Sequence, residues 1–210
     1  MSKYETHFEA VKNNQEKAVT YREQIKRYNI ALKNEFYIEA GMIAYAMLED
    51  RLKAFLYYIG AIRTIEADKL NVDKTKKTLK NIYFGSEEAA RNKRLDINKI
   101  SIKQSIIRKT LAWTENCIGT PENQYLAALK KEYEGRVDLG GLLDTLSEID
   151  VWTKERNELV HGLMNKRVDV LSDKLCLHAK EGMEYVRFVD SQVKSLKSSN
   201  TIRKKMKIKD

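Results

Sequence analysis

The scarcity of residues that break helices is the feature that most constrains the fold of this chain. Its 210 residues include one proline, Pro121, and nine glycines. A chain of many short strands needs many turns, and turns draw heavily on glycine and proline. The sequence therefore predicts an all-α protein built from long helices, without a significant sheet.

Apolar side chains recur at helical spacing along most of the chain. The strongest pattern lies over 35–67, where Ile38, Met42 and other apolar residues fall on one stripe and predict a buried face. A separate helix is expected to begin at Thr120 and Pro121, because threonine is a favoured N-cap and proline is favoured at the first helical position. The same spacing predicts further helices over 5–33, 71–83, 101–117, 139–164 and 168–196.

Length and composition fit one domain with extensions. Hydrophobic residues make up 42% of the chain and charged residues 33%, which allows a single sizeable core under a highly charged surface. The expected organisation is an N-terminal helical extension over 1–34, a helical domain over 35–197 and a basic, flexible tail over 198–210. Residues 84–98 are predicted to form a polar connection inside the domain.

Cysteine usage and hydropathy predict a cytoplasmic protein. Cys117 and Cys176 are far apart and match no metal-ligand spacing, so we expect two reduced thiols. The first residues are polar and lack the apolar region of a secretory signal. The longest apolar stretch, 38–48, is too short to cross a membrane and contains Glu39.

Positive charge is concentrated in two segments. The net charge is +9, and residues 71–110 hold eleven Lys and Arg against four Asp and Glu. Residues 203–210 hold five Lys and Arg against one Asp, and the rest of the chain is slightly acidic. Such segments favour a polyanionic partner, whereas the alternative is a solvated surface followed by a disordered tail. The candidate nucleic-acid contacts in the tail are Arg203, Lys204, Lys205 and Lys207.

Two charged residues fall on apolar stripes. A helical projection of 139–164 puts Arg156 in the middle of its stripe, and a projection of 35–67 does the same for Glu49. A buried guanidinium needs a counter-charge because it does not deprotonate. We therefore expect Glu49 and Arg156 to pair across a helix interface. The alternative is that frayed helix ends let each charge reach water.

The end of the predicted 139–164 helix carries a short motif. It reads Arg156-Asn157-Glu158-Leu159-Val160-His161-Gly162. The motif resembles the R-x4–6-H signature of the HEPN superfamily, the helical nucleotide-binding domains of higher eukaryotes and prokaryotes, in which a polar residue often follows the arginine. Many members also carry an acidic residue on an early helix, a role that Glu49 would fill. The resemblance extends to a basic, all-helical chain over 35–197 and implies a HEPN-like helical bundle.

The motif residues suit cleavage of RNA by its own 2′-hydroxyl. Histidine can take and return a proton near neutral pH, which predicts His161 as the acid–base residue. Arg156 can stabilise charge on the phosphate, and Asn157 can orient the imidazole or bind a phosphate oxygen. No metal or cofactor is expected, because the sequence contains neither a glycine-rich phosphate loop nor an H-E-x-x-H motif. The alternative for His161 is a surface histidine hydrogen-bonded to Asn157.

Other candidate groups are expected to lie outside any catalytic site. Asp144, Glu148 and Glu155 project to the solvent side of their helix, which does not favour a two-metal carboxylate site. His178, near Cys176 in the last long helix, is expected to have a structural role.

The resemblance implies a function and several partners. It implies a metal-independent endoribonuclease in which two motifs of a homodimer face each other across a two-fold axis, so that one histidine per chain suffices. It also implies a toxin or anti-phage defence setting, with an antitoxin or defence-complex partner. The main alternative is a non-catalytic HEPN-like module that binds RNA or a protein. A helical DNA-binding protein that uses 71–110 is a third reading, although no helix-turn-helix pattern stands out.

Overall fold

The computed structural model describes residues 14–162 and 167–209, and this part of the chain is all-α, as predicted. Within it no strand forms, although one isolated antiparallel bridge joins Lys69 to Asp96. None of the described helices is both long and apolar enough to cross a bilayer. The helices are α1 (Asn14–Lys33), α2 (Tyr37–Tyr58), α3 (Asp73–Phe84), α4 (Glu87–Ala90), α5 (Ile100–Asn116), α6 (Gln124–Arg136), α7 (Leu139–Gly162), α8 (Val168–Ser199) and α9 (Thr201–Lys205).

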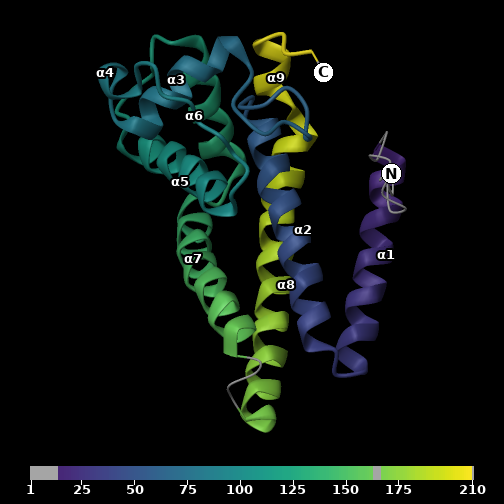
Figure 1. The fold of residues 1–210 in the computed structure, drawn as a ribbon. Helices are drawn as coiled ribbons and strands as arrows, with labels where there is room; N and C mark the ends of the chain where they lie inside the picture. Colours follow the sequence, from purple (N-terminus) through teal and green to yellow (C-terminus); the bar gives the residue numbers. More distant parts are fainter. Residues whose placement is uncertain (1–13, 163–166, 210) are drawn as a thin grey trace, which may run out of the picture.

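Two long helices form the spine of the molecule. Figure 1 shows α2 and α8 side by side and running in the same direction, with α1 against the outer side of α2 and α7 descending along α8. Helices α3 to α6 and the short α9 gather at one end of this spine. The end of α7 and the starts of α2 and α8 lie at the other end. The fold therefore has two distinct ends, which matters for the placement of the candidate site.

A glycine in α8 allows three helices to meet closely. A Cβ atom built on Gly182 would lie 2.4 Å from Cζ2 of Trp152 on α7 and 3.1 Å from Cβ of Ala44 on α2. Trp152 is 1% exposed, and its Nε1 donates a hydrogen bond to the backbone oxygen of His178 at 2.8 Å. Because no larger residue fits at position 182, this contact fixes how closely α8 approaches both neighbours.

The buried face of α2 differs from the predicted stripe at its N-terminal end. Ile38 and Met42 are 39% and 63% exposed, whereas Ala40 and Ala44 are fully buried. The small alanines face the interior because α8 packs too closely here for larger side chains. Further along α2 the prediction holds, since Leu52 is also fully buried.

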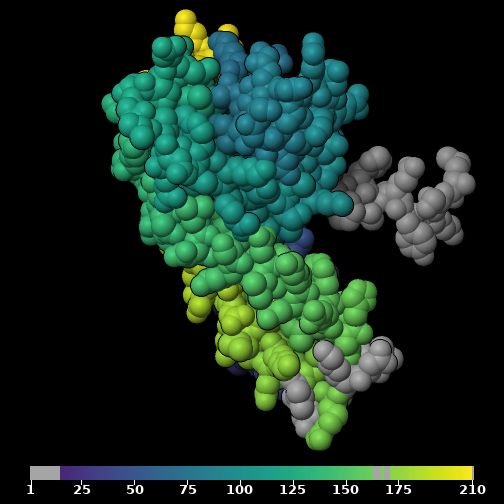
Figure 2. Space-filling model, turned by 90° about the vertical axis from the view of Figure 1, so that its left-hand side faces the viewer, coloured from purple at the N-terminus to yellow at the C-terminus, as the bar shows by residue number. Residues whose placement is uncertain are grey.

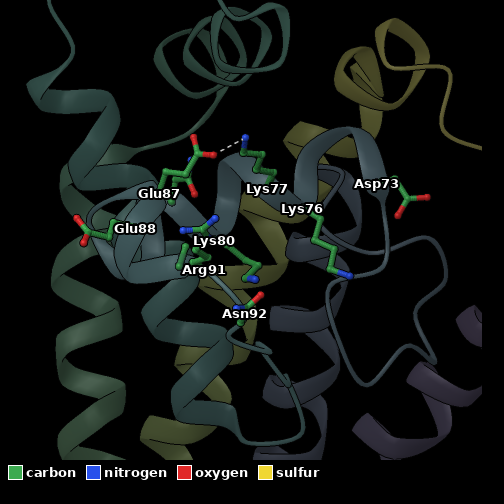
Figure 3. A pocket seen from close by; sticks show the side chains of 10 residues that line it. Asp73, Lys76, Lys77, Lys80, Glu87, Glu88, Arg91 and Asn92 are labelled. Carbon is green, nitrogen blue, oxygen red and sulfur yellow. Dashed lines mark ion pairs between the residues drawn. The ribbon is translucent and has the colours of Figure 1, made fainter.

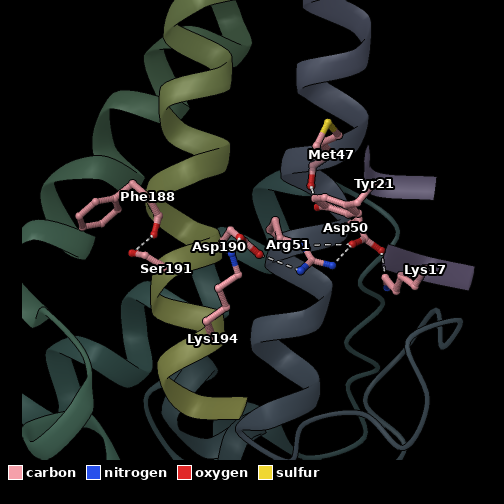
Figure 4. Close-up of polar contacts among 9 residues, drawn as sticks. All are labelled: Lys17, Tyr21, Met47, Asp50, Arg51, Phe188, Asp190, Ser191 and Lys194. Atoms are coloured by element: carbon pink, nitrogen blue, oxygen red, sulfur yellow. Dashed lines mark hydrogen bonds and ion pairs between the residues drawn. The ribbon is translucent and has the colours of Figure 1, made fainter. Parts of the chain in front are cut away.

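A chain of charged contacts joins α1, α2 and α8 (Figure 4). Lys17 Nζ lies 2.8 Å from Asp50, and Arg51 contacts both Asp50 and, at 2.9 Å, Asp190. The Arg51 guanidinium also lies 4.3 Å from the centre of the Tyr21 ring. These contacts are only partly exposed, so each helix is held in register with the next.

The first helix belongs to the main core. Tyr28 and Ala31 of α1 are 4% and 1% exposed and pack with the core residues of α2 and α8. The Tyr28 hydroxyl donates a hydrogen bond to the backbone oxygen of Ala179 at 3.0 Å. The described part of the predicted 1–34 extension is therefore packed into the same core as the 35–197 domain.

Two predicted boundaries differ from the structure. Helix α6 begins at Gln124, not at Thr120, because the Asn123 side chain accepts hydrogen bonds from the backbone nitrogens of the second and third following residues at 3.0 and 3.1 Å. Gly119, with a φ of 73°, turns the chain before that cap. The predicted connection over 84–98 contains the short helix α4, whose N-cap is Ser86.

The prediction of a flexible basic tail over 198–210 is wrong for residues 198–209. The end of α8 and the helix α9 occupy this segment, and Ile202 and Met206 are buried in the core. Lys74 Nζ donates a hydrogen bond to the Met206 backbone oxygen at 2.8 Å. The tail folds back because its apolar residues complete the core at the end of the spine that holds α3 to α6.

Arg203 is the polar anchor of this folded tail. It is 3% exposed and donates hydrogen bonds to the backbone oxygens of Tyr57, Ile62 and Arg63 at 3.2, 3.0 and 3.1 Å. Its guanidinium carbon also lies 3.7 Å from the centre of the Tyr57 ring. Arg203 thus satisfies carbonyl groups at and beyond the C-terminus of α2 and is not available for RNA, which corrects its predicted role.

Replacing Gly182 by alanine tests the close contact of α8. We expect the free energy of unfolding to fall by about 1–3 kcal/mol, because the new methyl group must displace the buried Trp152. Urea unfolding measures the change. In the control Gly135→Ala, a Cβ atom meets nothing within 4 Å, so helix propensity should leave stability unchanged or raised by about 0.5–1 kcal/mol. Equal stability of the two variants would contradict this account of the packing.

Replacing Arg203 by methionine tests the anchor of the tail. Three backbone oxygens lose their donor, so we expect unfolding free energy to fall by about 3 kcal/mol. The neighbouring exposed residue provides the control, since Lys205→Met should change stability by less than about 0.5 kcal/mol. Thermal melts compare the stability of the two variants directly. If the tail were flexible, neither change would lower the melting temperature.

Candidate active site

The three motif residues lie on the last turns of α7. Arg156 is half-buried, whereas Asn157 and His161 are exposed. Arg156 Nη2 donates a hydrogen bond to Oδ1 of Asn157 at 2.8 Å. Within the described residues, no hydrogen bond joins Asn157 to His161, so the expected alternative of a surface pair does not form. Figure 2 shows α7, in green, on an open face of the molecule.

An aromatic ring supports the Arg156 guanidinium. Its carbon atom lies 4.2 Å from the centre of the Tyr45 ring on α2. Tyr45 in turn stacks on Trp152, with ring centres 6.2 Å apart and planes inclined by 23°. The Nε atom of Arg156 is buried without a hydrogen-bond partner among the described residues. The guanidinium is therefore held by a cation–π contact and by Asn157.

The predicted pair of Glu49 and Arg156 is wrong. Glu49 accepts a hydrogen bond from Lys103 Nζ of α5 at 2.6 Å. The Lys103 side chain is fully buried, whereas that of Glu49 is 34% exposed. Burial lowers the pKa of Lys103, and the hydrogen bond and negative charge of Glu49 oppose this shift. A fully buried ammonium has a higher desolvation cost than a half-buried guanidinium. Glu49 therefore pairs with Lys103 and not, as predicted, with Arg156.

Arg156 consequently carries a positive charge without a carboxylate partner. Across residues 14–162 and 167–209, no acidic oxygen lies within 4.0 Å of its guanidinium. Asn157 is neutral and satisfies only one of the guanidinium donors. The charge and the guanidinium donors other than the buried Nε can therefore bind an oxyanion such as a phosphate.

His178 lies in the core behind the motif. It is 4% exposed and stacks on Trp152, with ring centres 4.6 Å apart and planes inclined by 9°. Its burial, together with the positive charge of Arg156, lowers the pKa of His178 to about 4. The rings of Tyr45, Trp152 and His178 thus form one stack beneath the arginine. The burial of His178 matches its expected structural role and excludes it from direct contact with a large substrate.

Four of the basic residues of 71–110 line a pocket at the far end of the molecule (Figure 3). Its volume is about 690 Å³, and its wall includes cations of α3 and of the segment after α4, together with acids of both helices. Lys77 pairs with Glu87 at 2.6 Å, so part of the positive charge is neutralised locally. The charged residues of the wall are Asp73, Lys76, Lys77, Lys80, Glu87, Glu88 and Arg91.

The structure separates the basic segments from the motif. Helices α3, α4 and α9 lie at one end of the spine, whereas the end of α7 lies at the other (Figure 1). Lys204, Lys205 and Lys207 are exposed at the α9 end. The structure therefore places Arg156, Asn157 and His161 on the last turns of α7, with a hydrogen bond between Arg156 and Asn157. It places the predicted nucleic-acid contacts of the tail, and the predicted support Glu49, outside that group.

Replacing Glu49 by glutamine should destabilise the protein through Lys103. The buried ammonium loses its counter-charge, so we expect the free energy of unfolding to fall by about 2 kcal/mol. This is less than the usual cost of breaking a buried ion pair, because water reaches Glu49. Adding Lys103→Met should restore most of this loss, since the charge that needs a partner is then absent. Arg156→Met should change stability by less than about 1 kcal/mol. Urea unfolding of the four proteins settles the pairing, and a double variant as unstable as Glu49→Gln alone would contradict it.

Comparison with known proteins adds no relative. Protein-family models, curated proteins and solved structures all give no match to this chain. The resemblance to HEPN domains therefore rests on the motif and its helical context, and a function has to be inferred from the geometry of α7 and its neighbours.

Proposed function

We propose that this protein is a metal-independent endoribonuclease that uses Arg156, Asn157 and His161. The observation that carries the proposal is the set of contacts made by the Arg156 guanidinium. It is held by Tyr45 and Asn157 but has no acidic partner within the described residues. Such an arginine can bind the scissile phosphate and stabilise the charge that develops in the transition state. His161, exposed on the next turn of the same helix, supplies the acid–base group.

The chemistry of the proposal calls for a second copy of the chain. Cleavage by the 2′-hydroxyl requires one group to remove its proton and another to protonate the leaving 5′-oxygen. His178 is buried, so each chain offers one accessible histidine among those described, and His7 lies outside the described residues. A homodimer with the ends of both α7 helices facing each other supplies two copies of His161.

Exposed apolar residues support this dimer. Several large apolar side chains of α2, α7 and α8, the helices around the motif, stay in solvent. A homodimer contact would cover such side chains. The residues are Ile38 and Met42 of α2, Val151 and Val160 of α7, and Leu177 of α8.

The partners and the setting complete the proposal. RNA that reaches past the motif toward the other end of the spine would meet the exposed Lys204, Lys205 and Lys207. These lysines would contact its phosphate backbone. A toxin or anti-phage defence setting, in the cytoplasm and with an antitoxin or defence-complex partner, rests on the family resemblance alone.

One observation favours a second candidate function. The Arg156 side chain already makes two contacts inside its own chain, which a structural arginine would also make. A non-catalytic HEPN-like module that binds RNA or a protein would keep these contacts without cleaving anything. RNA binding that survives His161→Ala, with no cleavage by the wild type, would favour this module.

Replacing His161 by alanine tests the proposed activity. Purified wild-type protein is incubated with total cellular RNA in excess EDTA, and we expect cleavage that His161→Ala lowers by a factor of about 10²–10⁴. Because His161 is exposed, the variant should have the same melting temperature as the wild type. Glu158→Ala, an exposed change between the motif residues, is the control and should cleave normally. Equal activity of His161→Ala and wild type would refute the assignment, and activity that disappears in EDTA would place the chemistry elsewhere.

A further inference from the structure

Three possible metal ligands from two helices meet beside the motif. Glu155 lies on α7, and His178 and Glu181 lie on α8. Each offers one donor atom, a ring nitrogen or a carboxylate oxygen, and these three atoms lie within 4.8 Å of one another. Glu155 is exposed, Glu181 is half-buried and His178 is buried, so the group runs from the core to the surface. This arrangement could not be read from the sequence, because Glu155 is more than twenty positions from the other two.

The fold holds the three ligands in place. His178 and Glu181 are three residues apart on α8 and therefore share one face of that helix. Trp152 precedes Glu155 by three residues on α7, and its ring lies flat against the His178 imidazole. Trp152 also donates a hydrogen bond to the His178 backbone oxygen, which ties α7 to α8 at this level. The imidazole is thus oriented by packing, whereas the exposed Glu155 can adjust.

The His178 ring nitrogens point to a missing ligand. Both are buried, and neither has a hydrogen-bond partner among the described residues. Buried polar atoms are normally satisfied, because an unpaired one loses its hydration without replacement. One of these nitrogens faces the carboxylates of Glu155 and Glu181. A cation between them would satisfy the nitrogen and both carboxylates at once.

The carboxylates themselves lack a cation. Glu148 and Glu184 lie close enough to Glu181 to add their negative charge to that of Glu155. None of the four acids has a Lys, Arg or His nitrogen within 4.0 Å in the described part of the chain. The site is therefore negatively charged on the side from which an ion would enter.

We propose that Glu155, His178 and Glu181 bind one divalent transition-metal ion, with Zn²⁺ as the best fit, and that this ion braces α7 against α8. An imidazole with two carboxylates suits Zn²⁺, whereas Mg²⁺ and Ca²⁺ prefer oxygen ligands alone. Tetrahedral zinc with bonds of about 2.0–2.2 Å holds its donors roughly 3.3–3.6 Å apart, so binding would require the exposed Glu155 side chain to move toward the other two ligands. Water would fill the remaining coordination position.

The proposed ion is a structural brace and takes no part in RNA cleavage. With two carboxylates the occupied site is neutral, so it adds no repulsion to the adjacent Arg156. The inference therefore stands apart from the proposed ribonuclease activity. Binding and melting measurements test it, while cleavage in EDTA tests the activity, so that failure of one leaves the other standing.

Titration calorimetry of the full chain with ZnCl₂ tests the brace. Cys117→Ser/Cys176→Ser protein serves as the background, because free thiols also bind zinc. After removal of metals with EDTA, we expect one Zn²⁺ per chain. At about one hundred times the dissociation constant, the melting temperature should rise by roughly 5–10 °C. Equal concentrations of MgCl₂ should leave it unchanged.

Three glutamine variants locate the ion. Glu181→Gln removes one ligand without changing shape and should weaken Zn²⁺ binding at least tenfold. Glu184→Gln removes the same charge from the same acidic surface but removes no ligand, so it should weaken Zn²⁺ binding less than threefold. Glu155→Gln should behave like Glu181→Gln. The proposal is overturned if wild type binds no stoichiometric Zn²⁺, or if Glu184→Gln and Glu181→Gln weaken binding equally, which would mark a diffuse acidic surface.

Discussion

The contact of Trp152 with Gly182 is the constraint on which the rest of this structure depends. The absence of a side chain at Gly182 lets α8 come close to α2 and α7, and Trp152 fills the space between them. From that ring the stack continues to Tyr45 on one side and to His178 on the other. The guanidinium of Arg156 lies on Tyr45, so the arginine of the candidate site is supported by a stack of packed rings.

Three cations with little access to water are stabilised in three different ways. Lys103 pairs with a carboxylate, Arg203 donates to backbone oxygens, and Arg156 rests on a ring and an amide. Neither Lys103 nor Arg203 has a role for an external anion, because Glu49 neutralises the charge of Lys103 and backbone oxygens accept the hydrogen bonds of Arg203. The third leaves the charge of Arg156 without an acid among the described residues. This difference, which burial alone would not reveal, singles out Arg156 as the cation suited to bind a phosphate.

The two ends of the spine have different characters. The end with α3, α4 and α9 carries the basic surface and the folded C-terminal segment (Figures 1 and 3). The other end carries the motif, exposed apolar residues and the acidic group around Glu181. An RNA drawn to the basic end by long-range attraction would have to extend along α7, the helix on the open face in Figure 2, to reach Arg156.

Local patterns in the sequence sufficed to predict the long helices and to place Arg156, Asn157 and His161 within two turns of one helix. They could not predict the partner of Glu49, since Lys103 on the sequence alone resembles any lysine of a basic surface. Nor could they predict that Arg203 is buried or that Ile38 and Met42 are exposed. Each of these outcomes depends on which helix covers which face, and that is decided by the tertiary structure, where close packing at Gly182 sets the distances between helices.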